Sequence, residues 1–204
     1  WAKGNYLIAD PLYHSYTDND YDRELTSVKG HNTIEVDGMD QKAGGWYLTG
    51  ERTGGRQGNI LNWETNESYD FLTAETVNYD EENVYPQRSI LFIKPGYWIV
   101  SDYLRTVDNA EHDYNQRWHM IPEADITMDD NTKTTRTNLE GSNIQVVPVG
   151  PEKYTDSQIL EGYYAGANRA NYVMYSQNDV AGPAVFDTVL YPEDAGADVT
   201  VTAD

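Results

Sequence analysis

Cysteine is absent from the 204-residue chain, which excludes disulfides and thiolate metal sites. No apolar run approaches the roughly 18 residues of a membrane-spanning helix, and no secretory signal is recognisable. Lysine and arginine are scarce, 14 against 34 aspartates and glutamates, so the net charge is −20. Because nucleic acids and anionic membranes are bound through clustered cations, this charge argues against both partners. The chain begins at Trp1 without a Met, which indicates a mature or trimmed piece of a longer protein.

The acidic residues are unevenly spread along the chain. Residues 1–60 hold six basic against nine acidic side chains, whereas residues 61–204 hold eight against 25. The nearly balanced part contains Arg23, Lys29, Lys42, Arg52 and Arg56. These five side chains form either a local basic rim for an anionic ligand inside a repulsive field, or a set of scattered, solvated charges.

Alternation of apolar and polar residues recurs along the chain, bounded by Gly, Pro, Asn and Asp, while helical periodicity is scarce. The pattern predicts an all-β fold, an antiparallel multi-stranded β-sandwich in a single domain over residues 1–204. A chain of this length buries roughly 70% of its unfolded surface and needs no covalent cross-link. The candidate strands are residues 5–9, 33–36, 45–49, 59–63, 68–79, 88–93, 97–105, 112–121, 143–147, 171–177, 184–190 and 198–202.

Connections between these strands are identified by turn-forming or polar residues. Lys94-Pro95-Gly96 predicts a hairpin turn, with Pro fixing φ at one corner and Gly taking φ > 0 at the next. Loops are predicted at residues 16–23, 80–83 and 128–138. Residues 158–170 fit a short helical turn or a loop, and the sequence does not decide between them.

A histidine beside a strand-like segment is the first candidate for chemistry. His31 lies at the start of GHNTIEVDG, residues 30–38, whose alternation ends on an Asp-Gly turn. Upstream, the apolar run at residues 6–9 delivers Asp10 directly before the strand-breaking Pro11. We expect Asp10 and His31 at neighbouring strand ends. A carboxylate with a neutral imidazole suits Zn²⁺, provided that a third protein ligand completes the set.

At these residues the chain resembles the β-sheet domain of the heparinase II/III family of polysaccharide lyases. The family pattern runs from an upstream His-x-His-x-x-Asp, through a hydrophobic strand ending in Asp-Pro-Gly, to a Tyr-bearing loop and then His-Asn-Thr-(Val/Ile)-x-Val-Asp-Gly. The residues that match in order are Asp10-Pro11, one of Tyr13, Tyr16 and Tyr21, and His31 to Gly38. Residues 88–104 followed by 112–122 resemble the family's paired strands, and residues 182–192 resemble its closing strand.

Two departures from the family pattern bear on the metal. Leu12 stands where the family usually has Gly, and Trp1 lies downstream of the place of the first His-x-His. The resemblance therefore implies a structural divalent metal, with Zn²⁺ favoured, that Asp10 and His31 hold together with a third ligand outside this chain.

The resemblance also implies an activity for the parent protein. This is β-elimination on a uronic-acid-containing polysaccharide, such as a glycosaminoglycan or alginate, by a secreted, periplasmic or cell-surface enzyme. Most catalytic groups would come from an N-terminal α/α toroid, so this chain alone is expected to be inactive. Tyr16 and Tyr21 are the candidates for the sheet's catalytic tyrosine, because a nearby charge tunes a phenol as acid or base. Arg23, Lys29 and Trp46 are the candidate substrate-binding residues.

The other histidines are assigned structural roles by default. His112 and His119 are seven residues apart, so on one strand they point to opposite faces and cannot serve one site. His14 is expected in an exposed loop. Two further classes of function stay open, a non-catalytic carbohydrate-binding module and an acidic extracellular domain that packs in an assembly. The first would stack sugars on aromatic rings, for which the candidates are Trp1, Trp46, Tyr47 and Trp63.

Overall fold

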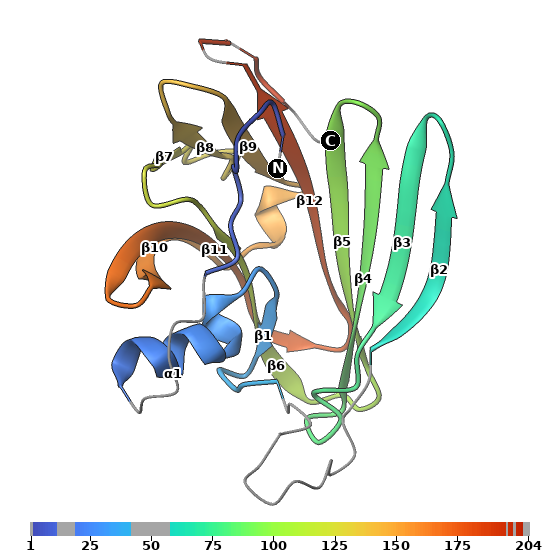
Figure 1. Cartoon of the computed structure of the whole chain (residues 1–204). Coiled ribbons are helices and arrows are strands. Elements are labelled where there is room, and N and C mark those ends of the chain that lie inside the picture. The colour runs from blue at the N-terminus through green and yellow to red at the C-terminus, as the bar shows by residue number, and fades with distance from the viewer. Residues whose placement is uncertain (1, 12–18, 42–57, 195, 198, 202–204) are drawn as a thin grey trace, which may run out of the picture.

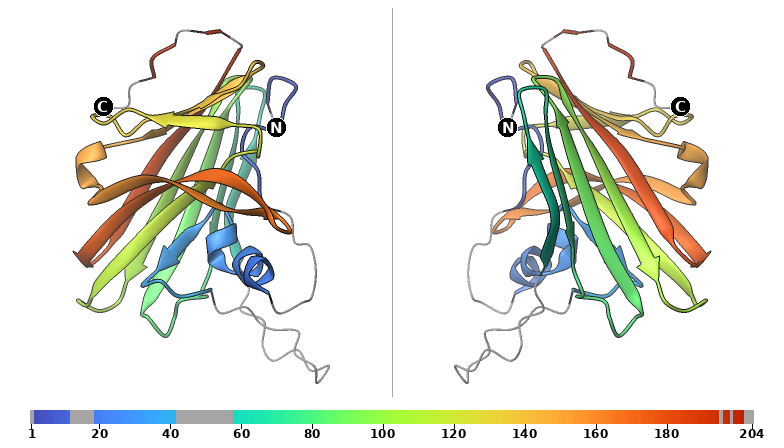
Figure 2. Two further views of the ribbon diagram at one scale, coloured as in Figure 1. Left: turned by 90° about the vertical axis from the view of Figure 1, so that its left-hand side faces the viewer. Right: turned by 90° about the vertical axis from the view of Figure 1, so that its right-hand side faces the viewer.

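Two antiparallel sheets are formed by the residues that the computed structural model describes, which are 2–11, 19–41, 58–194, 196–197 and 199–201. The small sheet has the order β1-β6-β11-β10 and the large sheet the order β2-β3-β4-β5-β12-β9-β8-β7 (Figure 1). In the left view of Figure 2, the β10–β11 hairpin crosses in front of the large sheet at a steep angle. The predicted all-β antiparallel sandwich is confirmed.

The strands of the small sheet are β1 (Ile34–Val36), β6 (Glu111–His119), β10 (Asp156–Ala165) and β11 (Asn168–Ala181). Those of the large sheet are β2 (Asn59–Thr65), β3 (Tyr69–Glu75), β4 (Val84–Ile93), β5 (Tyr97–Thr106), β7 (Asp125–Met128), β8 (Thr135–Asn138), β9 (Asn143–Pro148) and β12 (Ala184–Glu193). The helical elements are α1 (Asp20–Thr26) and two 3₁₀ turns, η1 (Val28–Gly30) and η2 (Pro151–Lys153).

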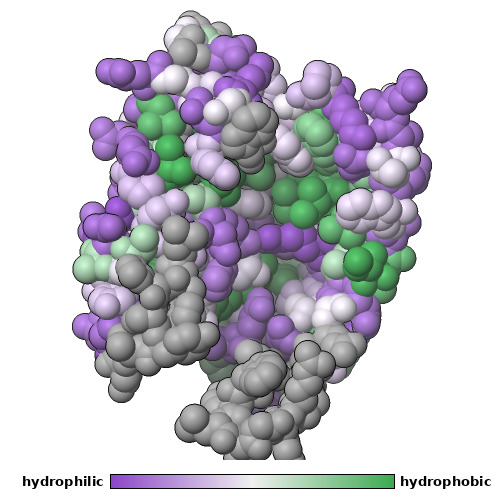
Figure 3. All heavy atoms as spheres, in the orientation of Figure 1, coloured by the Kyte–Doolittle hydropathy of each residue, from purple (hydrophilic) through white to green (hydrophobic). Residues whose placement is uncertain are grey.

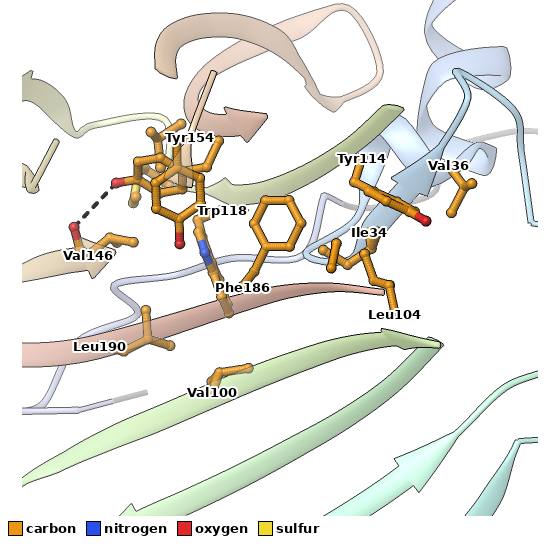
Figure 4. Packing of buried hydrophobic residues seen from close by; sticks show 14 of the residues in the cluster. Ile34, Val36, Val100, Leu104, Tyr114, Trp118, Val146, Tyr154, Phe186 and Leu190 are labelled. Atoms are coloured by element: carbon orange, nitrogen blue, oxygen red, sulfur yellow. Dashed lines mark hydrogen bonds between the residues drawn. The ribbon is translucent and has the colours of Figure 1, made fainter. Parts of the chain in front are cut away.

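The hydrophobic core lies between the two sheets. Side chains of a strand alternate between its faces, so every second residue of β6 and β12 points into the core. Tyr114 and Trp118 of β6 meet Phe186 and Leu190 of β12 there, and all four are buried (Figure 4). Each large apolar side chain buried in this way contributes about 1.5–3 kcal/mol to stability.

The sequence pattern did not predict the short helix α1, which packs on the small sheet. Residues 16–23 were predicted as a loop, but α1 begins at Asp20, with Asn19 as N-cap accepting the amide of Asp22 at 2.9 Å. Asp20 and Asp22 in the first turn complement the positive end of the helix. The helix contacts β10, and η1 contacts β1 and β10. Leu25 of α1 is buried, so packing on the sheet stabilises a seven-residue helix too short to form alone.

Several strand and loop predictions are wrong. Residues 5–9 form no ladder, since Ile8 makes one isolated bridge, to Met120, and Tyr6 is 70% exposed. The predicted loop 128–138 contains β8, and the undecided segment 158–170 is the β10–β11 hairpin. Residues 199–201 are not in a strand. Predicted strand 45–49 and residues 198 and 202 lie outside the described residues.

The hairpin predicted around Lys94-Pro95-Gly96 is confirmed, because β4 and β5 pair directly up to Ile93 and Tyr97. Its turn differs from the prediction. The Lys94–Pro95 peptide is cis, and Gly96 does not have a positive φ. The predicted loop 80–83 also connects two strands, β3 and β4. Within the described ranges, none of the helices has the length and apolar character to cross a membrane.

Candidate functional site

Asp10 and His31 lie next to each other on the surface. Asp10 Oδ1 is 3.0 Å from His31 Nδ1, and their side chains are 62% and 41% exposed. The predicted proximity of Asp10 and His31 is therefore confirmed, although neither residue belongs to a strand. His31 caps the C-terminal end of η1, three residues before β1.

Backbone contacts bring the two segments together. The amide of Ala9 donates to the carbonyl of His119 at 3.0 Å, which places Asp10 at the end of β6. The amide of His31 donates to the Val28 carbonyl at 3.2 Å, and Thr33 donates to the His31 carbonyl at 3.0 Å. The imidazole thus stands on a tight turn that these two backbone hydrogen bonds close.

Asn32 connects three parts of the site. Its side-chain amide donates to the Ala9 carbonyl at 2.8 Å, and its side-chain oxygen accepts the amide of His119 at 2.6 Å. Its backbone carbonyl accepts Arg88 NH1 at 2.6 Å. Nothing in the sequence indicated this role for Asn32, except that it lies beside His31, because its hydrogen-bond partners come from distant segments of the chain.

Arg88 forms a bidentate ion pair with the buried carboxylate of Asp102. Its Nε and NH2 donate to the two oxygens of Asp102 at 2.6 and 2.8 Å, and Gln116 donates to Asp102 at 2.8 Å. Although burial by itself lowers the pKa of Arg88, the Asp102 carboxylate raises it above its ordinary value. The guanidinium is therefore charged and fixed in a bidentate pair.

The Asp10–His31 pair fits a zinc ion by donor type and spacing. Two ligands of one tetrahedral Zn²⁺, each at about 2.0–2.1 Å, lie about 3.3 Å apart. The observed 3.0 Å is close to that separation, and both side chains are accessible. Two donors do not complete a site. Across the described ranges, no group of three or more His, Asp or Glu side chains is placed to hold a metal ion.

A buried ion pair joins strands β1 and β6 of the small sheet. Arg117 NH2 of β6 lies 2.6 Å from Glu35 Oε2 of β1, and both side chains are at least 95% buried. Asn115 Nδ2 donates to the same carboxylate oxygen at 3.0 Å, and Lys29 Nζ lies 3.8 Å from the other. A buried polar cluster therefore lies on this face of β6. It ties the three-residue β1, which follows His31, to the long strand β6.

His119 lies in the same layer. It is buried and stacks on Tyr172, with ring centroids 4.8 Å apart. Burial, and then the nearby charge of Arg117, lowers the pKa of His119 to about 4. The side chain is therefore neutral at physiological pH.

His112 forms a second carboxylate–imidazole pair on the other face of β6. Its Nδ1 lies 2.8 Å from Asp37 Oδ2, and its Nε2 lies 3.7 Å from Asp108 Oδ1. Asp37 also accepts the amide of Asp113 at 2.8 Å and has a positive φ of 53° beside Gly38. Since His112 is 6% exposed, this pair fastens the Asp-Gly turn after β1 to β6.

The other predicted site residues do not gather around Asp10 and His31 as a set. Tyr21 lies on α1, where its ring packs edge-on against Tyr163. Arg23 pairs with Asp20 one turn away on the helix surface. Lys29 pairs with Glu35 as described above. The remaining predicted residues lie outside the described part of the chain: Trp1, His14, Tyr16, Lys42, Trp46, Tyr47, Arg52 and Arg56.

Three aromatic side chains, which we call the aromatic strip, lie on the inner face of the large sheet, as the strand register shows. Phe92 and Trp98 are stacked, with centroids 4.5 Å apart and planes inclined by 11°, and Trp63 on the edge strand β2 is 64% exposed. Trp98 and Ile90 also line a cavity of about 320 Å³ between the sheets. Figure 3 shows apolar side chains gathered over β4 and β5 on this side of the molecule.

Comparison with known proteins identifies the family. The model described as "Heparinase II/III-like, C-terminal" matches residues 1–189. The chain belongs to this family. The matched residues include the Asp10–His31 pair, the Arg88–Asp102 pair and most of β12. A search of curated proteins finds no match.

Solved structures of heparinases have the same fold as this heparinase II/III-like domain. A heparinase III described as the BT4657 gene product superposes with a TM-score of 0.77 at 21% identity, covering 97% of this chain and 29% of its own. A mutant of the heparan sulfate lyase HepC from Pedobacter heparinus gives a TM-score of 0.74 at 19% identity, covering 94% and 29%. The domain thus spans less than a third of the length of these enzymes.

Proposed function

We propose that this heparinase II/III-like domain is the β-sandwich part of a polysaccharide lyase that cleaves uronic-acid-containing chains by β-elimination. The family membership and the likeness to heparinases support this activity. A helical toroid of the same parent protein would contribute most of the catalytic groups, so the domain alone is inactive. The parent enzyme acts in the periplasm, at the cell surface or outside the cell.

The single observation that carries the role of this domain is the Asp10–His31 pair. The two groups meet at 3.0 Å on an accessible surface, and both are hard or borderline donors that suit a divalent ion. We propose that they hold a structural Zn²⁺ together with a third ligand supplied from outside this chain. The ion would supply positive charge and a cross-link between the Asp10 segment and the His31 turn.

The protein's own groups would act as follows. His31 would bind the ion as a neutral imidazole through Nδ1 and keep its proton on Nε2, and Asp10 would supply a carboxylate oxygen beside it. Tyr16 or Tyr21 would donate or accept the proton that β-elimination moves. Arg23 and Lys29, which are 57% and 54% exposed, and Trp46 would contact the anionic polymer.

The experiment measures formation of the unsaturated uronate product by its ultraviolet absorbance. The complete protein containing this domain is assayed on heparan sulfate, other glycosaminoglycans and alginate, beside the isolated chain. We expect product from the complete protein and none from the isolated chain. Asp10→Asn and His31→Gln are expected to lower activity at least tenfold, whereas Asp37→Asn, in the other carboxylate–imidazole pair, serves as the matched control. Absence of product on every substrate would refute the lyase proposal.

The aromatic strip favours a second function, binding of carbohydrate without cleavage. Exposed indole rings stack on the C–H faces of sugars, and Trp63 stands 64% exposed on an edge strand. Calorimetric titration with neutral and acidic oligosaccharides tests this function, with Trp63→Ala as the variant. Tyr6→Ala, which removes an aromatic side chain 70% exposed elsewhere on the surface, is the control. Loss of binding in Trp63→Ala alone would support the function, and no binding by the unchanged protein would exclude it.

A further inference from the structure

We infer that Asn32 is the positioning residue that holds Asp10 and His31 in register, and that Arg88 fixes Asn32 in place. This inference rests on the proposed metal role of the pair. Asn32 itself touches neither the Asp10 carboxylate nor the His31 ring through any hydrogen bond found in the described part of the chain. It acts on the backbone that carries them.

The contacts of Asn32 reach both sides of the pair at once. Its side-chain nitrogen donates at 2.8 Å to the carbonyl of Ala9, which directly precedes Asp10. Its side-chain oxygen accepts the amide of His119 at 2.6 Å, while its own backbone continues from His31. One amide group therefore joins the Asp10 segment, the His31 turn and the end of β6.

This link replaces a sheet ladder that the Asp10 segment does not have. Among the described residues, the segment 2–11 makes one isolated bridge to the rest of the protein, between Ile8 and Met120, and the amide of Ala9 donates to the carbonyl of His119. A segment held by so few backbone bonds opens easily unless side chains fasten it. The Asn32 amide is the side-chain fastening closest in sequence to both proposed ligands.

Arg88 prevents Asn32 from turning away. Its NH1 donates to the Asn32 carbonyl at 2.6 Å, and Asp102 holds the other side of the guanidinium through two bonds of 2.6 and 2.8 Å. Asp102 is 3% exposed, and Gln116 donates to it from β6. The position of the His31 turn is thus set by a charged pair anchored between the two sheets.

The test compares Asn32→Asp with Asn143→Asp in the complete protein. An aspartate at position 32 can still accept the His119 amide but has no N–H for the Ala9 carbonyl, so the link opens on the Asp10 side. Asn143 is the matched control, because its side-chain amide also joins backbone groups, but in the turn between β8 and β9. Its side-chain oxygen accepts the amide of Leu139 at 2.8 Å, and its side-chain nitrogen donates to the carbonyl of Leu139 at 3.2 Å.

Two readouts are taken. The first is the affinity for Zn²⁺ alone, measured by competition with a chelating dye, which we expect to fall about 10- to 100-fold in Asn32→Asp. The second is the tautomer of His31 in the metal-free protein, read from its imidazole ¹⁵N shifts. We expect the Nδ1–H form in the unchanged protein and in Asn143→Asp, and a tautomer mixture in Asn32→Asp.

Each outcome decides the inference. Unchanged Zn²⁺ affinity and tautomer in Asn32→Asp, or the same loss in Asn143→Asp, would overturn it. If Asn32→Asp does not fold, Asn32→Ser, whose hydroxyl is too short to reach both partners, is judged by the same criteria. If the unchanged protein binds no Zn²⁺, the proposed metal role fails, while the tautomer shift in the metal-free protein still supports or overturns the role of Asn32.

Discussion

Replacing Arg117 by Met is expected to destabilise the protein strongly, because it leaves a buried carboxylate without its main partner. Glu35 is 2% exposed and Arg117 lies 2.6 Å from it. Removing one partner of a buried ion pair costs about 3–5 kcal/mol. Glu35 retains Asn115 at 3.0 Å and Lys29 at 3.8 Å, so we expect a loss of about 3 kcal/mol, the lower end of this range.

A double-mutant cycle separates this pair from the general cost of mutation. Glu35→Gln removes the buried charge and keeps a side chain of the same shape. The double variant Arg117→Met with Glu35→Gln is therefore expected to be more stable than the sum of the two single losses predicts, by about 2 kcal/mol. Because β1 has only three residues, the pair also fixes the strand that follows His31, and Arg117→Met should weaken Zn²⁺ binding as well.

Urea unfolding, extrapolated linearly to water, gives the free energies for the cycle. The slopes of the four proteins should agree, which shows that the compactness of the unfolded state is unchanged. Two additive single losses below about 1 kcal/mol each would show that Glu35 and Arg117 are not a coupled buried pair, since losses of this size are expected of an exposed pair.

Two other predictions concern stability. Because the pKa of His119 is lowered to about 4 by burial and by Arg117, the unfolded state binds more protons than the folded state between about pH 6.5 and 4. Stability should therefore fall by up to about 3 kcal/mol as the pH drops through this window, and a calorimetric pH series should show a smaller fall in His119→Gln. Gly30→Ala would place a Cβ 2.8 Å from the Glu24 carbonyl and should cost about 1–3 kcal/mol by urea unfolding. Gly141→Ala, whose Cβ meets ordinary contact at 3.5 Å, should be nearly neutral, and equal effects would contradict the steric argument.

The sheet class was predictable because period-two alternation survives in most strands. In β12, for example, alternate residues from Ala184 to Leu190 are buried, and the boundaries predicted for β5 and β9 differ from the structure by one residue at most. Short polar strands escaped this signal. β8, with the sequence TRTN, has no apolar residue to mark its buried face, and Thr135 and Thr137 are buried through hydrogen bonds instead.

The proximity of Asp10 and His31 was also predictable, but the structure that produces it was not. The expected strand at residues 5–9 is an extended segment with isolated bridges, and α1 folds where a loop was expected. A seven-residue polar helix depends on its cap and on burial of Leu25, neither of which produces a periodic pattern.

The residues around the pair could not be found from local sequence. Asn32 is bonded to residues 23, 56 and 87 positions away, and Arg88 to Asp102 across two strands. Each of these side chains is polar and sits in a segment that reads as an ordinary strand or turn. Their role is visible only when the sheets bring the distant segments together.

The proposed metal site is tested by the zinc stoichiometry of the complete protein, measured by elemental analysis after dialysis. We expect about one Zn²⁺ per chain in the unchanged protein and in Asp37→Asn, and loss of the ion in both Asp10→Asn and His31→Gln. Retention of full zinc content in either of those two variants would contradict the claim that Asp10 and His31 are ligands of one metal site.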